Sequence, residues 1–300
     1  MPTRITRIDA HHHFWSYDPA EYGWIDDSMA MLRRDFLHAE LQPEVEAVGI
    51  EGIVSVQARQ SLEETHWLLE QAAAHPVVKG VVGWAPLIAY DVKDQLGTFA
   101  YCHTLKGIRH VVQDEPDDQF LLRDDFNRGI DALAEFQLTY DILISERQLP
   151  QAIKFVDRHP GQVFVLDHLG KPRVREGQLE PWTMNIRQLA ERENVYCKLS
   201  GLVTEADWNA WTESQLAPYS EVILGAFGPQ RLMFGSDWPV CLLATSYRSW
   251  YEVCRHFTAA LSADEQSRIF GGTAIEAYRL TTDHGQLTPG NTPTHASLPH

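Results

Sequence analysis

Residues 52–87 read GIVSVQARQSLEETHWLLEQAAAHPVVKGVVGWAPL, and the order of elements in this stretch indicates the fold class. Its two ends, Gly52–Arg59 and Val78–Leu87, are short runs rich in valine, a residue that strands favour. Between them, Ser61 precedes a segment with helical spacing, and Glu64 follows three residues later, as in a capping box. A strand, a helix and a second strand in this order predict a crossover unit that joins two parallel strands.

The same alternation recurs along the chain as far as residue 261. The other predicted strands are Arg4–His13, Thr104–Val112, Leu138–Ile144, Val163–Gly170, Val195–Gly201 and Arg231–Val240. The predicted helices are Leu62–His75, Leu122–Phe136, Leu149–His159, Trp182–Glu193, Asp207–Ala226 and Tyr247–Leu261. Eight strands that alternate with helices predict an α/β fold, a single (β/α)8 TIM-like barrel with a C-terminal helix. An open doubly wound sheet is the alternative. We assign residues 1–282 to the barrel and residues 283–300 to a tail.

Composition limits the partners that this chain can have. A formal net charge of −16, from 41 acidic and 25 basic residues, repels nucleic acid and anionic lipid surfaces. No apolar run reaches the roughly 18 residues of a membrane span, and no apolar segment follows the basic start of the chain. The four scattered cysteines include no CxxC pair. We therefore expect a cytoplasmic protein that acts on a small molecule and binds neither nucleic acid nor membranes.

A histidine cluster ends the first predicted strand, in the letters DAHHH. Because side chains alternate along a strand, His11 and His13 share one face and His12 points to the other. His168 in DHLGKP and Asp237 in GSDWP also follow strands, although each alone could serve a loop. The strands of a parallel barrel all end at one mouth, where His11, His13, His168 and Asp237 would meet. Three imidazoles and a carboxylate predict a site for one divalent ion such as Zn²⁺.

Aromatic and polar side chains at other strand ends suit a sugar ring, because they combine flat apolar faces with groups that bind hydroxyls. The predicted substrate-binding residues are Trp24, Gln57, Trp84, Arg109, His110 and Tyr140. Each of them could instead pack in the core or anchor a loop. Arg109 and His110 are neighbours on one strand, so we expect only one of them to line the mouth unless a bulge intervenes. That residue could hold an oxyanion or a sugar hydroxyl.

Six phrases carry a family resemblance: DAHHHFW, YGWI, GIRHVV, DHLGKP, KLSGL and LMFGSDWPV, in this order between Ile8 and Leu280. They resemble the amidohydrolase superfamily of metal-dependent TIM-barrel hydrolases. More closely, they resemble its sugar-lactonase branch, of the L-fuconolactonase and L-rhamnonolactonase type, which is related to 2-pyrone-4,6-dicarboxylate lactonase. The resemblance implies that Asp237 takes a proton from the hydrolytic water and that the matching histidines bind the metal. His168 and Asp237 are thus the expected catalytic residues.

One departure from the superfamily pattern concerns the number of metal ions. Members with two metals place a bridging lysine or glutamate on the fourth strand and a histidine on the fifth. Here the fifth strand reads TYDIL and the fourth ends in Ile-Arg-His, so one ion is expected. Some relatives in the lactonase branch work without a metal, which leaves its requirement to experiment.

The expected function is hydrolysis of L-fuconolactone, or a similar L-sugar lactone, to the aldonic acid by water that the metal and Asp237 activate. The alternatives are a zinc-dependent decarboxylase of the same superfamily and, less favoured, a non-catalytic sugar-binding barrel. The sequence contains no GxGxxG motif after a strand, no GxxxxGK[ST] and no GxSxG. Dinucleotide binding, P-loop chemistry and a serine nucleophile therefore lack support.

Overall fold

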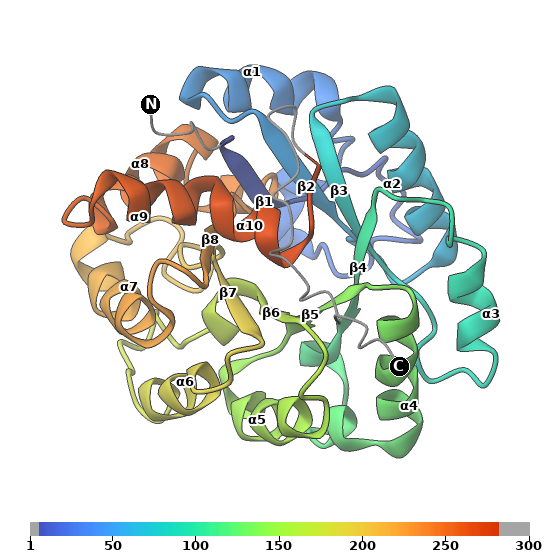
Figure 1. The fold of residues 1–300 in the computed structure, drawn as a ribbon. Helices are drawn as coiled ribbons and strands as arrows, with labels where there is room; N and C mark the ends of the chain where they lie inside the picture. The colour runs from blue at the N-terminus through green and yellow to red at the C-terminus, as the bar shows by residue number, and fades with distance from the viewer. Residues whose placement is uncertain (1–5, 282–300) are drawn as a thin grey trace, which may run out of the picture.

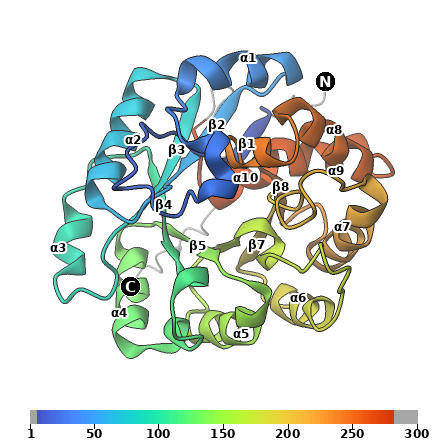
Figure 2. The same cartoon turned by 180° about the vertical axis from the view of Figure 1, so that it is seen from behind.

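In the computed structural model, which describes residues 6–281, eight parallel strands form a barrel surrounded by helices (Figures 1 and 2). The strands are β1 (Ile8–His12), β2 (Gly52–Val56), β3 (Val78–Gly83), β4 (Leu105–Val111), β5 (Thr139–Leu143), β6 (Phe164–Leu166), β7 (Val195–Leu199) and β8 (Leu232–Phe234). They pair in sequence order from β1 to β8, and a bridge between His12 and Trp238 nearly closes the barrel. Sequential order with this closure confirms the predicted (β/α)8 barrel over the doubly wound alternative.

Ten α-helices are present among the described residues. They are α1 (His38–Val48), α2 (Leu62–Ala74), α3 (Val92–Gly97), α4 (Asp124–Glu135), α5 (Leu149–Arg158), α6 (Trp182–Ala190), α7 (Glu213–Phe227), α8 (Tyr247–Phe257), α9 (Ala263–Ser267) and α10 (Thr273–Ala277). No helix among these residues is long and apolar enough to span a membrane. The six predicted helices are confirmed, although α7 begins later than expected because residues 207–212 form turns. The predicted tail, residues 283–300, lies outside the described residues.

The sequence interpretation missed α1, α3 and α9. The signal for α1 was there, because Leu41, Val45 and Val48 have helical spacing and all three are buried. Gly49 then ends this helix in the left-handed conformation, with φ of 72°. Pro43 lies inside this helix, where its nitrogen has no hydrogen to donate to the carbonyl four residues back.

Two hydrophobic cores stabilise the barrel. The larger lies between the strands and the outer helices, and the smaller fills the barrel itself with side chains such as Ile8, Val54 and Met233. The smaller core includes residues of α10, the helix that lies across the end of the barrel seen in Figure 1. Figure 2 views the opposite end. With one end filled and covered in this way, the strand carboxyl ends are left to form the site.

Two tryptophans of the outer helices tie down the loops that follow β6 and β8. Trp182 in α6 is buried and donates its indole N–H to the carbonyl of Leu169, at 2.8 Å. Trp250 in α8 does the same to the carbonyl of Gly235, at 2.9 Å. Because buried indoles need an acceptor, these bonds fix the backbone beside His168 and Asp237. These two tryptophans thus help to position the candidate site.

Helix packing generates a matched stability prediction for two helical glycines. In α4, a Cβ at Gly129 would collide with the backbone carbonyl of Leu87, whereas a Cβ at Gly225 in α7 would meet nothing within 4 Å. We expect Gly129→Ala to lower the free energy of unfolding by about 1–3 kcal/mol through overpacking. Gly225→Ala should raise it by up to about 1 kcal/mol, because alanine favours helices. Equilibrium urea denaturation measures both, and changes of the same sign would contradict the packing described.

Candidate active site

The end of β1 supplies two inward-facing histidines. His11 and His13 point into the barrel, while His12 points outward and its Nε2 lies 2.9 Å from Ser55 Oγ. The pairing of β1 with β2 shifts register between Asp9 and His12. This irregularity lets His11 face the interior although Ala10, its neighbour, also belongs to the interior core. The expected orientations of the three histidines are found, and they depend on the register shift.

The other two predicted groups stand in strained backbone after β6 and β8. His168 has φ of 51° and Asp237 has φ of 57°, a left-handed conformation that costs a non-glycine residue about 1–2 kcal/mol. Asp237 is held there by its N–H, which donates to the carbonyl of His11 at 2.8 Å. The next bond of the same ladder runs from His13 N–H to the carbonyl of Trp238, at 2.7 Å. Strain of this kind is typical of functional sites.

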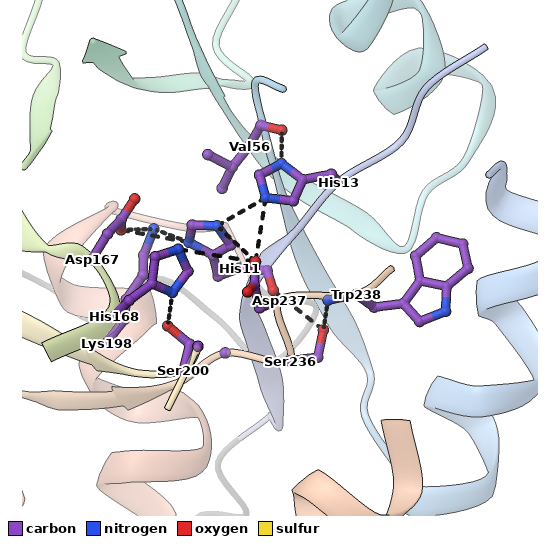
Figure 3. A network of polar contacts seen from close by, with 12 residues as sticks. His11, His13, Val56, Asp167, His168, Lys198, Ser200, Ser236, Asp237 and Trp238 are labelled. Carbon is purple, nitrogen blue, oxygen red and sulfur yellow. Dashed lines mark hydrogen bonds and ion pairs between the residues drawn. The ribbon is translucent and has the colours of Figure 1, made fainter. Parts of the chain in front are cut away.

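The four side chains converge, as Figure 3 shows. His11 Nε2 and His13 Nε2 are 3.2 Å apart. Asp237 Oδ1 lies 3.5 Å from His13 Nε2, 3.7 Å from His11 Nε2 and 3.9 Å from His168 Nε2. All four residues are at least 95% buried. The structure therefore brings together the four residues that the sequence placed at one mouth.

Second partners orient two of the imidazole rings. His13 Nδ1 lies 2.8 Å from the carbonyl of Val56, which can only accept, so Nδ1 donates its proton there and Nε2 faces the site. His168 Nδ1 lies 2.9 Å from Ser200 Oγ. Gly201, at φ of 65°, packs against the same ring, since an added Cβ would lie 2.5 Å from His168 Nδ1. The rings are thus fixed by their surroundings as well as by their own strands.

Electrostatics set the protonation states at neutral pH. Burial lowers the pKa of His168 to about 4 and holds that of His11 well below its usual value, where the charge of Lys198 adds to the effect. Burial opposes ionisation of Asp237, but His168 and a hydrogen bond with His13 outweigh it and lower the pKa of Asp237. The site therefore presents the neutral imidazoles of His11 and His168 beside a carboxylate.

The donor set fits a zinc ion. Tetrahedral Zn²⁺ with bonds of about 2.0–2.1 Å has ligand atoms about 3.3 Å apart. The separations among His11 Nε2, His13 Nε2 and Asp237 Oδ1 are 3.2, 3.5 and 3.7 Å. His168 belongs to a second group of converging donors, with His11 and Asp167. Neutral imidazoles and an ionised carboxylate are the ligand forms that zinc requires.

A pocket of about 490 Å³ opens above these groups, within the range typical of small-molecule sites. Two predicted substrate-binding residues, Trp24 and Arg109, line it together with His13, His168, Lys171 and Asp237. Among the described residues, the buried Nε1 of Trp24 has no hydrogen-bond partner, so it is free to donate to a ligand. Arg109 rather than His110 faces the mouth, which answers the question left by their adjacency.

The structure does not bring the other four predicted substrate-binding residues to this pocket. Gln57 is fully buried, and its backbone carbonyl accepts a hydrogen bond from Arg109. Trp84 donates to His110 Nδ1 at 3.3 Å, and the His110 ring stacks on Phe120 on the outer side of the barrel. Tyr140 is fully buried among the phenylalanines of the outer core, which are Phe126, Phe155 and Phe164. For His110 and Tyr140 the reason is that even-numbered side chains of β4 and β5 face the helices.

The sequence interpretation missed a set of buried charges beside the histidines. Asp167 accepts a hydrogen bond from Arg109 at 2.9 Å and lies 2.9 Å from Lys198 Nζ. Lys198 also lies 2.6 Å from Asp141. Strand alternation would put Asp167 and His168 on opposite faces, but the left-handed turn at His168 turns both inward. Arg109 pairs with Asp141 in the sheet, and the register from β5 through β6 to β7 puts Lys198 on the same face. No signal in a single strand gives this register.

Known proteins are similar to this chain over most of its length. The family described as Amidohydrolase matches residues 8–280. An L-fucono-1,5-lactonase of Burkholderia multivorans is 43% identical, covering 91% of this chain and 96% of that protein. A second L-fucono-1,5-lactonase, from Burkholderia ambifaria, is 35% identical, covering 93% and 97%. The crystal structure of a Burkholderia multivorans amidohydrolase with bound zinc superposes with a TM-score of 0.88 at 42% identity, covering 92% of this chain and all of that one.

The adjacent histidines of β1 allow a matched test of the metal site. Asparagine reproduces the Nδ1 position of histidine and lacks Nε2, so the same change tests an inward and an outward ring. We expect His13→Asn to weaken Zn²⁺ binding by roughly 100-fold or more. A factor of about 100 is the upper end of the effect of losing a residue that only supports a metal ligand, and His13 is itself a candidate ligand. His12→Asn should leave Zn²⁺ affinity unchanged. Titration against a chromophoric chelator measures both, and equal losses would contradict the assignment.

Proposed function

The chain belongs to the amidohydrolase family, and from this membership and its site we infer that it hydrolyses the cyclic ester of a sugar lactone. The substrate that we propose is L-fucono-1,5-lactone or a similar L-sugar lactone, and the product is the aldonic acid. The observation that carries the proposal is the convergence of Asp237 on three imidazoles at a pocket, in a chain 43% identical to an L-fucono-1,5-lactonase. The four free cysteines are compatible with the cytoplasm, where we propose that it acts.

Asp237 is the proposed general base. Its lowered pKa keeps it ionised at neutral pH, and its carboxylate faces the pocket. As a water oxygen bonds to the carbonyl carbon of the lactone, Asp237 accepts the proton. When the bond between that carbon and the ring oxygen breaks, Asp237 returns the proton to the leaving alkoxide. The net reaction adds one water to the lactone and gives a hydroxy acid.

A zinc ion held by His11, His13, His168 and Asp237 would supply a Lewis acid that polarises a carbonyl and acidifies water. The neutral state of His11 and His168 suits this ligand role. The guanidinium of Arg109 lines the pocket and lies 3.5 Å from His11 Nε2, so its charge can stabilise the oxyanion. Zinc is our proposal for the ion.

The pocket walls suit a neutral, hydroxylated ring. The Trp24 indole offers an apolar face and a free N–H. On another wall, Lys171 and Glu205 form an ion pair of 3.7 Å and present both donors and acceptors. A decarboxylase would need an unbalanced positive charge for the full negative charge of the substrate carboxylate, whereas each cation that lines the pocket already has a carboxylate partner: Arg59 has Glu21, Arg109 has Asp167 and Lys171 has Glu205. The geometry therefore favours the lactonase over that alternative.

The proposal is tested by a panel of L- and D-aldonolactones, with and without a chelator. Proton release, followed with a pH indicator, should be fastest with L-fucono-1,5-lactone or a close L-sugar analogue and should fall when the chelator removes the metal. Aromatic carboxylic acids, assayed for CO2 release, provide the comparison for the alternative reaction. Absence of acid release from all lactones, together with CO2 release, would replace the lactonase by a decarboxylase.

Substitution of the proposed base gives a second prediction. Asp237→Asn should lower turnover by a factor of about 10²–10⁴, the usual contribution of a general base, or abolish it. Asparagine tolerates the left-handed backbone at this position, so the thermal unfolding temperature should change little. The matched control is Glu205→Gln, which neutralises another carboxylate of the pocket and should keep most of the turnover. Full activity in Asp237→Asn would remove this residue from the mechanism.

A further inference from the structure

A cluster of charged side chains is buried inside the barrel, directly below the histidines. Its members are Arg109, Asp141, Asp167 and Lys198, which are 0–4% exposed. Lys198 Nζ lies 2.6 Å from Asp141 Oδ2, 2.9 Å from Asp167 Oδ1 and 3.1 Å from His11 Nδ1. Figure 3 shows Lys198 and Asp167 beside the His11 ring. The ammonium group of Lys198 therefore joins the charged cluster to one of the candidate metal ligands.

The other end of this cluster reaches the C-terminal helix. Tyr278, the residue after α10, is fully buried in the interior core and donates its hydroxyl to Asp141 Oδ2, at 2.7 Å. Asp141 Oδ2 thus accepts from Tyr278 and from Lys198. A continuous series of contacts runs from Tyr278 through Asp141 and Lys198 to His11 Nδ1. It links the helix that covers one end of the barrel to the site at the other end.

Stability alone is a weak explanation for such a cluster. Removing two cations and two anions from water costs as much as their attraction returns, and apolar side chains of similar size often stabilise a core better. The cluster instead fixes the orientation of its side chains, because each donor has a fixed acceptor. A histidine ligand is held in orientation by an acceptor at its second nitrogen, and the carboxylate oxygen that faces His11 Nδ1 is Asp167 Oδ1, at 3.5 Å. Lys198 Nζ holds that oxygen at 2.9 Å.

We propose that Tyr278 is a positioning residue for the active site, whose hydroxyl fixes Asp141, through it Lys198, and through Lys198 the Asp167 carboxylate that faces the ring of His11. Tyr278 touches neither the pocket nor the reacting atoms and acts only through these contacts. The proposal rests on the proposed function, because the ring that it positions belongs to the lactonase site. Its consequence is that α10, remote from the mouth, is needed to orient His11.

The test compares two tyrosines that lose the same group. Tyr278→Phe removes the hydroxyl that donates to Asp141 inside the barrel. Tyr196→Phe is the matched control, because Tyr196 in β7 donates its hydroxyl to Glu276 of α10 at 2.8 Å, on the outside of the barrel. Both changes remove one tyrosine–carboxylate bond near α10, and neither changes the net charge. Two quantities are measured on the full chain: the dissociation constant for Zn²⁺ added alone to the metal-free protein, and kcat and KM for the lactone.

We expect Tyr278→Phe to raise the dissociation constant for Zn²⁺ and to lower kcat, each by roughly 10-fold, the lower end of the effect of losing a supporting residue. KM should stay unchanged, because Tyr278 does not reach the pocket. Tyr196→Phe should alter none of these quantities. Asp141→Asn, which removes the other half of the same bond, should reproduce the loss and serves if Tyr278→Phe does not fold.

Equal values for Tyr278→Phe and Tyr196→Phe would overturn the proposal, even if Tyr278→Phe unfolds at a lower temperature. If the unsubstituted protein hydrolyses no lactone, the proposed function fails, and the Zn²⁺ dissociation constants alone decide whether Tyr278 positions His11. If it hydrolyses lactones without binding Zn²⁺, the kcat comparison decides. A protein that neither binds Zn²⁺ nor hydrolyses lactones would overturn both proposals.

Discussion

Two backbone hydrogen bonds close the barrel at the end where its side chains converge. Asp237 N–H donates to the carbonyl of His11 and His13 N–H to the carbonyl of Trp238, at 2.8 and 2.7 Å. Asp9 reinforces the junction, because its Oδ1 accepts from the backbone N–H groups of both His11 and Ser236. The same bonds that join the first strand to the segment after the last one set the proposed base against two imidazoles. Barrel closure and site geometry are therefore a single feature, and the left-handed backbone of Asp237 is its local cost.

Inside the barrel, the surroundings change from apolar at the covered end to charged in the middle and open at the pocket. The apolar layer contains Ile8 and Val54, and the charged layer contains Asp167, whose pKa Lys198 and His11 hold well below its usual value against the effect of burial. A low dielectric strengthens each of these interactions. In such surroundings His11 and His168 stay neutral while Asp237 stays ionised. Because Asp237 stays ionised, it can accept a proton and act as a base.

Local patterns predicted most of the fold but fewer of the contacts. All eight strands are found, and each is shorter than its predicted range. The predicted ranges included residues such as Asp167 and Trp238, which follow the paired part of the strand. Helix α1 was missed although Leu41, Val45 and Val48 have helical spacing. Of the six residues assigned to the substrate, Trp24 and Arg109 line the pocket. The other four were chosen for their position near strand ends, and position along a strand does not say which face a side chain takes.

The order of residue types along the chain is enough to place three histidines and an aspartate at the ends of barrel strands, since hydrophobic periodicity and strand alternation are local properties. Two further features of the site depend on the tertiary structure alone. A register shift in β1 turns His11 inward beside Ala10, and a left-handed turn brings Asp167 and His168 to the same side. The acceptor at the second nitrogen of a ring, such as Asp167 for His11 and Val56 for His13, comes from a different part of the chain. Such contacts depend on how the sheet curves and closes, a global property that no single segment encodes.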